Sequence, residues 1–224
     1  MSCPCDAHSY VFLGEAGSGK TELSVNCAIH LARTQNKQVC FFDMDQTKGL
    51  FRARDLQKQL EDSGVVLFDT IQFQDSPVVP LGVTGALENE DSICVFDVGG
   101  NAIGSRMIGQ YSRYLDKACC FYVVNPNRPF SSKAPDVKAS MEQVLSASRI
   151  PMERVRLVSN PCMGEETSVE SILRDHQKLV DILATMGMSP SMLTVDKKYF
   201  DAVRTQLNCS IFPIQLYVKN LYKT

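Results

Sequence analysis

The stretch YVFLGEAGSGKT at residues 10–21 constrains the fold of this chain more than any other feature. It begins with four apolar or aromatic residues, as a buried strand would, and ends in the phosphate-loop pattern GxxxxGK(S/T). The positions that match this pattern are Gly14, Gly19, Lys20 and Thr21. A loop that wraps polyphosphate needs backbone N–H groups pointing inward, so we expect positive φ at Gly14, Gly17 and Gly19.

The residues after the loop read as a helix over 19–33, whose N-terminal amides and dipole favour an anion. In such a loop the lysine reaches the β and γ phosphates, and the Ser/Thr hydroxyl ligates Mg²⁺. We therefore predict Lys20 as a catalytic residue and Thr21 as a metal ligand. The predicted nucleotide-binding residues are Gly14, Glu15, Ala16, Gly17, Ser18, Gly19, Lys20, Thr21 and Glu22.

Composition and charge exclude several classes of protein. The chain has 224 residues, is 44% hydrophobic and has a net charge of −2, so one substantial core is expected and a broad nucleic-acid-binding surface is not. No signal peptide and no apolar run of about 18 residues is present, so we expect a cytoplasmic protein without a transmembrane segment. The nine cysteines are then expected to be thiols. Residues 1–8, with Cys3 and Cys5, read as a flexible leader.

Apolar runs alternate with amphipathic segments along the rest of the chain. The predicted strands lie at residues 10–13, 38–43, 65–68, 92–97, 118–124 and 155–159, and residues 210–218 read as a strand or a docking segment. Helices are predicted at residues 19–33, 50–63 and 197–207, with a helical turn at residues 83–87. Three further helices are expected: one that carries Met107, Ile108, Tyr111 and Leu115, one with apolar positions between Val137 and Ser148, and one through Val169 to Leu183 that opens with a capping box of Thr167 and Glu170. This alternation predicts one α/β domain over residues 1–224, a doubly wound, mostly parallel sheet of about seven strands with helices on both faces.

Acidic and glycine-rich residues follow two of the predicted strands. Asp97 ends the apolar run ICVF and is expected to bind magnesium, while Gly99 and Gly100 can turn a backbone amide toward the γ phosphate. Asp43 and Asp45 follow the second strand; we predict Asp43 as a metal-shell group and Asp45 as the catalytic group that orients the attacking water. In a parallel sheet these strand ends meet at one edge, where ligands bind in open α/β folds.

The order of these motifs resembles the MinD/ParA-type ATPases of the SIMIBI class, which include the nitrogenase iron protein and the carbon monoxide dehydrogenase maturation ATPase. The matching segments are the phosphate loop, DMDQTKG at residues 43–49, VFDVGG at residues 95–100 and the Asn-Pro strand end of Asn160 and Pro161. The resemblance implies ATP with Mg²⁺, hydrolysis coupled to a protein client, a nucleotide-dependent homodimer, switches at Asp45 and at residues 97–100, and adenine recognition by Asn160. Residues 194–200 match the base-side loop of the family.

Two positions bear on how closely the family pattern applies. Many members carry a second lysine directly after the first glycine of the loop, and Glu15 stands there instead; a carboxylate cannot supply that positive charge, although Lys48 or Arg106 could. The guanine signature NKxD is also missing, since NPNR at residues 125–128 lacks its lysine and aspartate. The sequence therefore favours ATP over GTP.

Three functions are compatible with these motifs. The first is a switch ATPase acting on a protein client, such as a metalloenzyme under maturation. The second is a small-molecule kinase or ligase of the dethiobiotin synthetase-like type, with the loop at residues 72–84 as its acceptor site. The third is a membrane- or DNA-positioning ATPase, for which the C-terminal residues 214–224 show no clean amphipathic stripe and instead favour docking onto the body of the protein.

Overall fold

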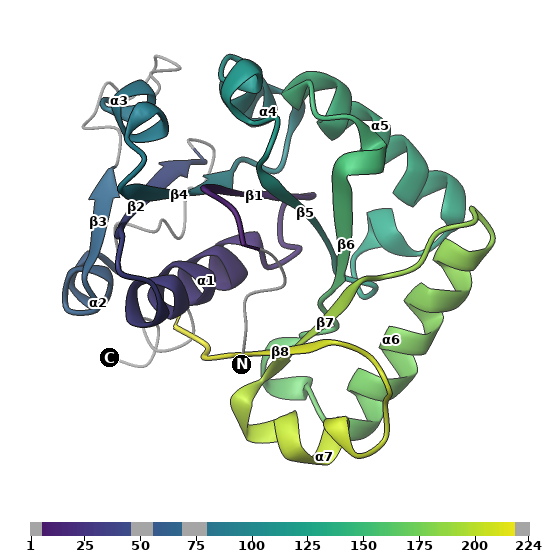
Figure 1. The fold of residues 1–224 in the computed structure, drawn as a ribbon. Coiled ribbons are helices and arrows are strands. Elements are labelled where there is room, and N and C mark those ends of the chain that lie inside the picture. Colours follow the sequence, from purple (N-terminus) through teal and green to yellow (C-terminus); the bar gives the residue numbers. More distant parts are fainter. Residues whose placement is uncertain (1–5, 46–55, 69–79, 218–224) are drawn as a thin grey trace.

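The computed structural model describes residues 6–45, 56–68 and 80–217, and the described chain is built on one eight-stranded sheet (Figure 1). The strands are β1 (Ser9–Leu13), β2 (Gln38–Met44), β3 (Val65–Phe68), β4 (Ser92–Val98), β5 (Cys119–Val124), β6 (Val155–Ser159), β7 (Met192–Asp196) and β8 (Ile211–Ile214). Their order is β3-β2-β4-β1-β5-β6-β7-β8, and each neighbouring pair is parallel. The predicted α/β fold is confirmed.

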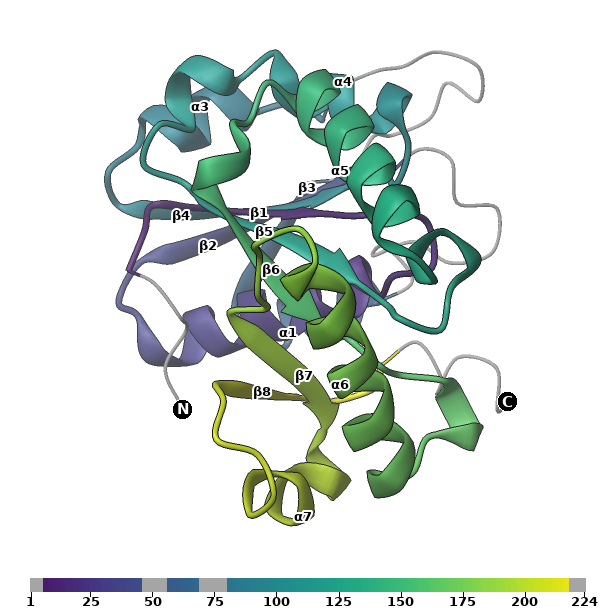
Figure 2. The same cartoon turned by 90° about the vertical axis from the view of Figure 1, so that its right-hand side faces the viewer.

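Helices cover both faces of this sheet. They are α1 (Lys20–Thr34), α2 (Gln57–Glu61), α3 (Val83–Glu88), α4 (Ala102–Gly109), α5 (Ala134–Ser148), α6 (Val169–Ala184) and α7 (Phe200–Arg204). In both views α1 lies on one side of the sheet, whereas α3, α4 and α5 lie on the other (Figures 1 and 2). Each residue of β1, β4 and β5 is buried, because strands sandwiched between two helical layers present apolar side chains to both.

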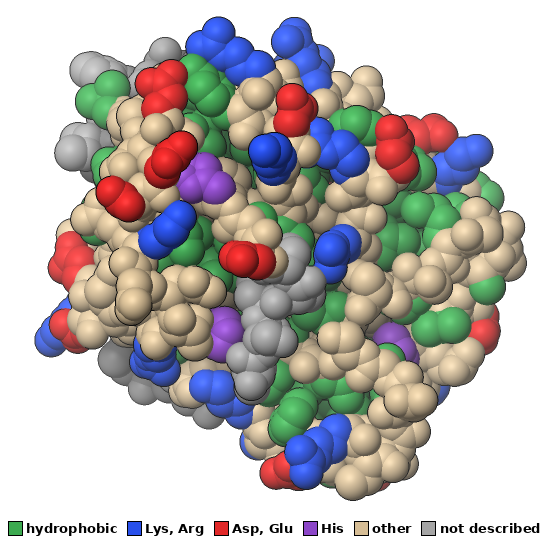
Figure 3. Space-filling model, in the orientation of Figure 1, with side chains coloured by type: hydrophobic (Ala, Val, Ile, Leu, Met, Phe, Trp, Pro, Cys, Tyr) green, Lys and Arg blue, Asp and Glu red, His purple; other side chains and the backbone are tan. Residues whose placement is uncertain are grey.

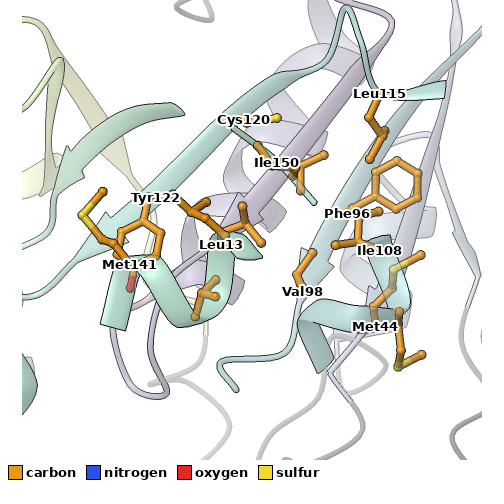
Figure 4. Close-up of a cluster of buried hydrophobic side chains, with 14 of the residues drawn as sticks. Leu13, Met44, Phe96, Val98, Ile108, Leu115, Cys120, Tyr122, Met141 and Ile150 are labelled. Carbon is orange, nitrogen blue, oxygen red and sulfur yellow. The ribbon is translucent and has the colours of Figure 1, made fainter. Parts of the chain in front are cut away.

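Alternate side chains of the central strands divide the core into two layers. Val11 and Leu13 pack into the cluster under α4 and α5, while Tyr10 and Phe12 pack into the cluster under α1. Figure 4 shows the first cluster, in which residues from β1, β4 and β5 meet those from α4 and α5. The strands are held from both faces, so their carboxyl ends form one rigid edge.

The structure differs from the sequence prediction at one strand. β7 was not predicted, and residues 194–196 were expected to belong to the base-side loop at residues 194–200; in the structure β7 pairs in parallel with both β6 and β8. The strand has only five residues, MLTVD, and Pro190 stands two positions before it. So short a run carries little periodicity, and its burial depends on neighbours distant in sequence.

Three helix boundaries also differ from the prediction. The helix expected over residues 50–63 is α2 in the described part of the chain, where it ends at Glu61; residues 50–55 lie outside the described residues. The capping box before α6 is formed by Ser168 and Ser171, one residue later than predicted. The helix expected over residues 197–207 is a 3₁₀ turn, Lys197–Tyr199, followed by α7.

The cysteines correct one expectation and confirm another. Cys119 is disulfide-bonded, although all cysteines were expected to be thiols; Cys40, Cys94, Cys120, Cys162 and Cys209 are free thiols. Cys119 and Cys120 were predicted to face opposite sides of the sheet, and they do belong to different core clusters. The predicted leader, apart from its last residues, lies outside the described chain, which resumes at Asp6 and enters β1 at Ser9.

The surface carries charges of both signs. On the face seen in Figure 3, Lys and Arg side chains are interspersed with Asp and Glu side chains. None of the described helices combines the length and apolar character that a bilayer crossing requires.

Candidate functional site

The phosphate loop connects β1 to α1 at the carboxyl edge of the sheet. Its glycines adopt the positive φ that the pattern predicts: 132° at Gly14, 75° at Gly17 and 97° at Gly19. At Gly19 a second constraint acts, because a Cβ placed there would lie 2.0 Å from the side-chain nitrogen of Asn160. Glycine is thus required at this position by both backbone conformation and space.

The loop brings its lysine and threonine to the positions that phosphate and magnesium chemistry need. Lys20 is 3% exposed, and its Nζ donates to the backbone carbonyl of Glu15 at 2.9 Å, which holds the ammonium across the mouth of the loop. The Thr21 hydroxyl donates to Oδ2 of Asp97 at 2.6 Å. Asp97 is the penultimate residue of β4, the strand next to β1, so the pairing of these two strands brings it to the loop.

Asp43 and Asp45 lie beside this pair. Asp43 on β2 is in register with Asp97 on β4, and its Oδ1 accepts from the backbone N–H of Asp45 at 3.0 Å. The Asp45 carboxylate approaches Gly99, since a Cβ placed on Gly99 would lie 3.3 Å from Oδ1 of Asp45. The two acidic strand ends predicted from the sequence therefore meet at one place.

Gly100 contacts the phosphate loop directly. A Cβ on Gly100 would lie 2.4 Å from the backbone nitrogen of Ala16, closer than any real contact of a Cβ. The backbone after β4 therefore rests on the loop itself, and only glycine permits that approach.

The oxygen atoms assembled here fit a magnesium ion. Mg²⁺ prefers oxygen ligands and is usually held in proteins by one or two carboxylates together with substrate phosphates and water. Thr21 and Asp97 provide a hydroxyl and a carboxylate 2.6 Å apart, with Asp43 in register beside them. Within the described ranges no group of three or more His, Cys, Asp or Glu residues is arranged to hold a metal by itself.

Glu15, the position that departs from the family pattern, points away from the phosphate site. Its Oε1 accepts from the Ser140 hydroxyl on α5 at 2.6 Å, and Ser140 lies 2.7 Å from the hydroxyl of Tyr122 on β5. Since the single proton of Ser140 is donated to Glu15, Tyr122 must donate to Ser140. Burial raises the pKa of Tyr122, which keeps that donor protonated. The Glu15 carboxylate thus ties the loop to α5.

Asn160, predicted to recognise adenine, binds the backbone of the phosphate loop. Its Nδ2 donates to the Ser18 carbonyl at 2.7 Å, and its Oδ1 accepts from the Thr194 hydroxyl at 2.8 Å. Both ends of the amide are therefore engaged with the protein. Pro161 follows and turns the chain into the loop that lines a pocket beside Asn160.

That pocket lies between the ends of β6 and β7. It is lined by Asn160, Pro161, Cys162, Gly164, Thr167, Ile172, Thr194, Val195, Asp196, Tyr199 and Leu216. Tyr199 is fixed there by a hydrogen bond from its hydroxyl to the Thr167 carbonyl at 2.6 Å. Apolar walls with a few fixed polar groups are typical of small-molecule sites. The pocket adjoins the phosphate loop through Asn160, whose amide binds the Ser18 carbonyl.

The C-terminal segment after β8 closes one side of this region. The Asn26 side chain on α1 donates to the Gln215 carbonyl at 2.9 Å and accepts from the Gln215 N–H at 2.8 Å. The Tyr217 N–H donates to the Glu22 carboxylate. Docking of this segment was predicted and is confirmed for residues 215–217; the remainder of the tail, 218–224, lies outside the described residues.

Sequence reasoning missed the residues that hold the site in place. Ser140, Asn26 and Arg128, whose Nε donates to the Gly17 carbonyl at 3.1 Å, reach the loop or the first turns of α1 from distant parts of the chain. Arg128 follows a buried strand within NPNR, and its place at the carboxyl edge was the one available signal. The proposed alternative cation Lys48 lies outside the described residues.

Comparison with known proteins yields only distant likenesses. No family model and no curated protein matches the chain. Among solved structures, FlhF complexed with GMPPNP/Mg²⁺ has 17% identity over 77% of this chain and 62% of its own, with a TM-score of 0.48. The signal recognition particle receptor FtsY from Elizabethkingia anophelis in complex with GDP has 13% identity over 100% of this chain and 66% of its own, with a TM-score of 0.44.

The 54 kDa protein of the signal recognition particle from Aeropyrum pernix K1, in complex with GDP, has 14% identity over 99% of this chain and 46% of its own, with a TM-score of 0.37. The chain thus spans about half to two thirds of the length of these structures. Likeness at this level assigns neither a family nor a ligand to the chain.

Proposed function

We propose that this chain is a P-loop nucleoside triphosphatase that binds ATP with Mg²⁺ and uses hydrolysis as a conformational switch. The observation that carries the proposal is the 2.6 Å hydrogen bond between Thr21 and Asp97. A threonine hydroxyl after the loop lysine and a carboxylate at the end of the neighbouring strand are the two protein groups that hold magnesium in P-loop enzymes. Chance glycine turns between a strand and a helix do not require such a partner.

Each remaining group has a role consistent with its contacts. Lys20 neutralises the β and γ phosphates, and Asp45 orients the water that attacks the γ phosphate. Bound Mg²⁺, held by Thr21 and Asp97 with Asp43 in its outer shell, would supply charge neutralisation on the phosphates. Because Gly100 rests on Ala16 and Asp45 lies against Gly99, a change at the γ phosphate reaches both segments together.

The function of such a switch is to change the affinity for a partner. By its motif order the chain belongs, in this proposal, with the MinD/ParA-type ATPases, and its client is a protein such as a metalloenzyme under maturation. Any nucleotide-dependent homodimer uses groups other than Glu15, because Ser140 holds that carboxylate within the same chain. Sedimentation of Asp45→Ala with saturating ATP tests the dimer, since slow hydrolysis preserves the ATP state.

GTP is the second candidate nucleotide, and one observation favours it. Asp196 lines the pocket beside Asn160, and a carboxylate can accept two N–H groups from the edge of guanine, whereas adenine offers only its amino group. Competition of ATP and GTP against a fluorescent nucleotide decides between them. Asp196→Ala should leave ATP affinity nearly unchanged if adenine is bound, and should abolish a GTP preference if guanine is bound.

The two other functions have less support in the described residues. The acceptor loop of a small-molecule kinase or ligase, residues 72–84, lies mostly outside them. A membrane- or DNA-positioning ATPase would need a C-terminal tail free to bind a surface, and residues 215–217 instead contact α1. Vesicle sedimentation with and without ATP tests the membrane version.

The decisive experiment for the main proposal uses two variants. Lys20→Ala should lose nucleotide binding, because it removes the buried ammonium at the loop mouth, whereas Asp45→Ala should retain binding and lose hydrolysis. Equilibrium binding of a fluorescent ATP and release of phosphate measure the two properties separately. Binding by Lys20→Ala equal to that of the wild type would contradict the proposed site.

A further inference from the structure

An arginine from outside the phosphate-loop pattern lies against the loop. Arg128 belongs to the segment after β5, and its Nε donates to the Gly17 carbonyl at 3.1 Å. A Cβ placed on Gly17 would lie 3.3 Å from the same Nε, so the guanidinium packs directly on this residue. Asn160 binds the next carbonyl, that of Ser18. Two side chains from different strand ends thus hold consecutive carbonyls of the loop.

The segment that carries Arg128 is fixed at several points. Asn125 donates to the Cys162 carbonyl at 2.9 Å, and Asn127 donates to the buried carboxylate of Asp175 on α6 at 3.0 Å. The backbone N–H of Arg128 closes a turn by donating to the backbone carbonyl of Asn125 at 3.1 Å. The backbone that carries the Arg128 side chain is therefore fixed beside the loop.

Arg128 differs from the other two charged side chains of this region in its exposure. Glu15 directs its carboxylate to Ser140, and Lys20 is buried at the loop mouth, whereas Arg128 is an exposed cation beside the loop. Its hydrogen bond to Gly17 uses Nε alone, and the two terminal amino groups bond to none of the described residues. A guanidinium has a planar fork of donors that matches the oxygens of a phosphate.

We propose that Arg128 is a phosphate-binding residue of the nucleotide site, which it serves from outside the loop pattern. It holds the Gly17 carbonyl through Nε and presents its terminal amino groups to the phosphates of the bound nucleotide. The inference rests on the proposed nucleotide-binding function and adds to it a cation that the sequence motifs do not contain. Because the group is exposed, salt screens its contribution.

The test is equilibrium binding of a fluorescent ATP at low and high ionic strength, with Arg128→Met, Arg128→Lys and a matched control. Arg204→Met is the control, since Arg204 is an exposed arginine on α7. Arg128→Met should weaken binding about tenfold at low salt, a loss of one charge-assisted hydrogen bond, and by less at high salt. Arg128→Lys should recover part of the low-salt loss because it keeps the charge, while the control binds as the wild type.

Distinct results would overturn each level of the inference. Failure of the wild type to bind any nucleotide would remove the proposed function itself. If the wild type binds and Lys20→Ala does not, affinity of Arg128→Met within twofold of the wild type at both salt concentrations would remove Arg128 from the site. Equal losses for the Met and Lys variants with unchanged salt dependence would assign Arg128 a structural contact with the loop and no role for its charge.

Discussion

Replacement of Asn26 by alanine should release the C-terminal segment from α1 and destabilise the protein. The side chain makes two hydrogen bonds to the backbone of Gln215, at 2.9 and 2.8 Å. Each such bond contributes about 0.5–1.5 kcal/mol, so the free energy of unfolding should fall by about 1–3 kcal/mol. The hydrogen bond of Asn26 to the Glu22 carbonyl adds little, because that carbonyl lies within a helix. For a domain of this size a loss of about 2 kcal/mol lowers the melting temperature by about 4–8 °C.

Thermal unfolding followed by circular dichroism measures this change, with Asn208→Ala as the matched control. Asn208 is exposed, and its side chain makes no hydrogen bond within the described residues, so its loss should change the free energy of unfolding by less than about 0.5 kcal/mol. Leu216 lines the pocket beside Asn160, and ATP affinity should therefore also fall in Asn26→Ala. Equal melting temperatures for Asn26→Ala and the control would refute the contact between α1 and residues 215–217.

Three further results are expected. Gly100→Ala should impair ATP binding, measured by fluorescence titration, because its Cβ would lie 2.4 Å from the Ala16 nitrogen; unchanged affinity would contradict that close contact. Burial lowers the pKa of His176, so the unfolded state binds a proton first and the free energy of unfolding falls as pH drops below about 6.5. Between pH 7.5 and 5.5 the free energy of unfolding, measured with urea, should fall less for His176→Gln than for the wild type. An equal fall would contradict the assignment of this pH dependence to His176. Iodoacetamide at pH 8 should label the half-buried Cys162 and not Cys94, whose pKa is raised to about 12 by burial, and ATP should protect Cys162; mass spectrometry of labelled peptides checks both.

The parts of the fold that the sequence predicts are those with strong local patterns. β1, β4 and β5 are continuous apolar runs, and α1 follows directly from the loop pattern. β7 was missed because a run of five residues with one threonine and two aliphatic side chains has no sequence pattern that separates a strand from a buried loop. Its strand conformation depends on β6 and β8, whose partner residues are not adjacent in sequence. Pairing of that kind is decided by tertiary packing.

In the candidate site, too, the sequence predicts some features and not others. The contact of Thr21 with Asp97, and the nearness of Asp45 to Gly99, could be anticipated because the ends of parallel strands meet at one edge. The direction in which a single side chain points could not be anticipated from the sequence. The resemblance implies that Asn160 recognises adenine, and this stays a prediction; the sequence did not indicate that the Asn160 amide also binds Ser18 and Thr194.

Glu15 shows why a motif alone cannot assign the role of a substituted position. In the sequence alone, a carboxylate one residue after Gly14 indicates repulsion of a triphosphate, because like charges at short range repel. The structure relieves that repulsion through Ser140, which is 125 positions away and accepts in turn from Tyr122. Loss of the Ser140 hydroxyl would leave the carboxylate without this partner and free to turn toward the phosphates. The substitution at Glu15 and the serine on α5 therefore have to be interpreted as one pair, and the pair links the loop to the helix that follows the Arg128 segment.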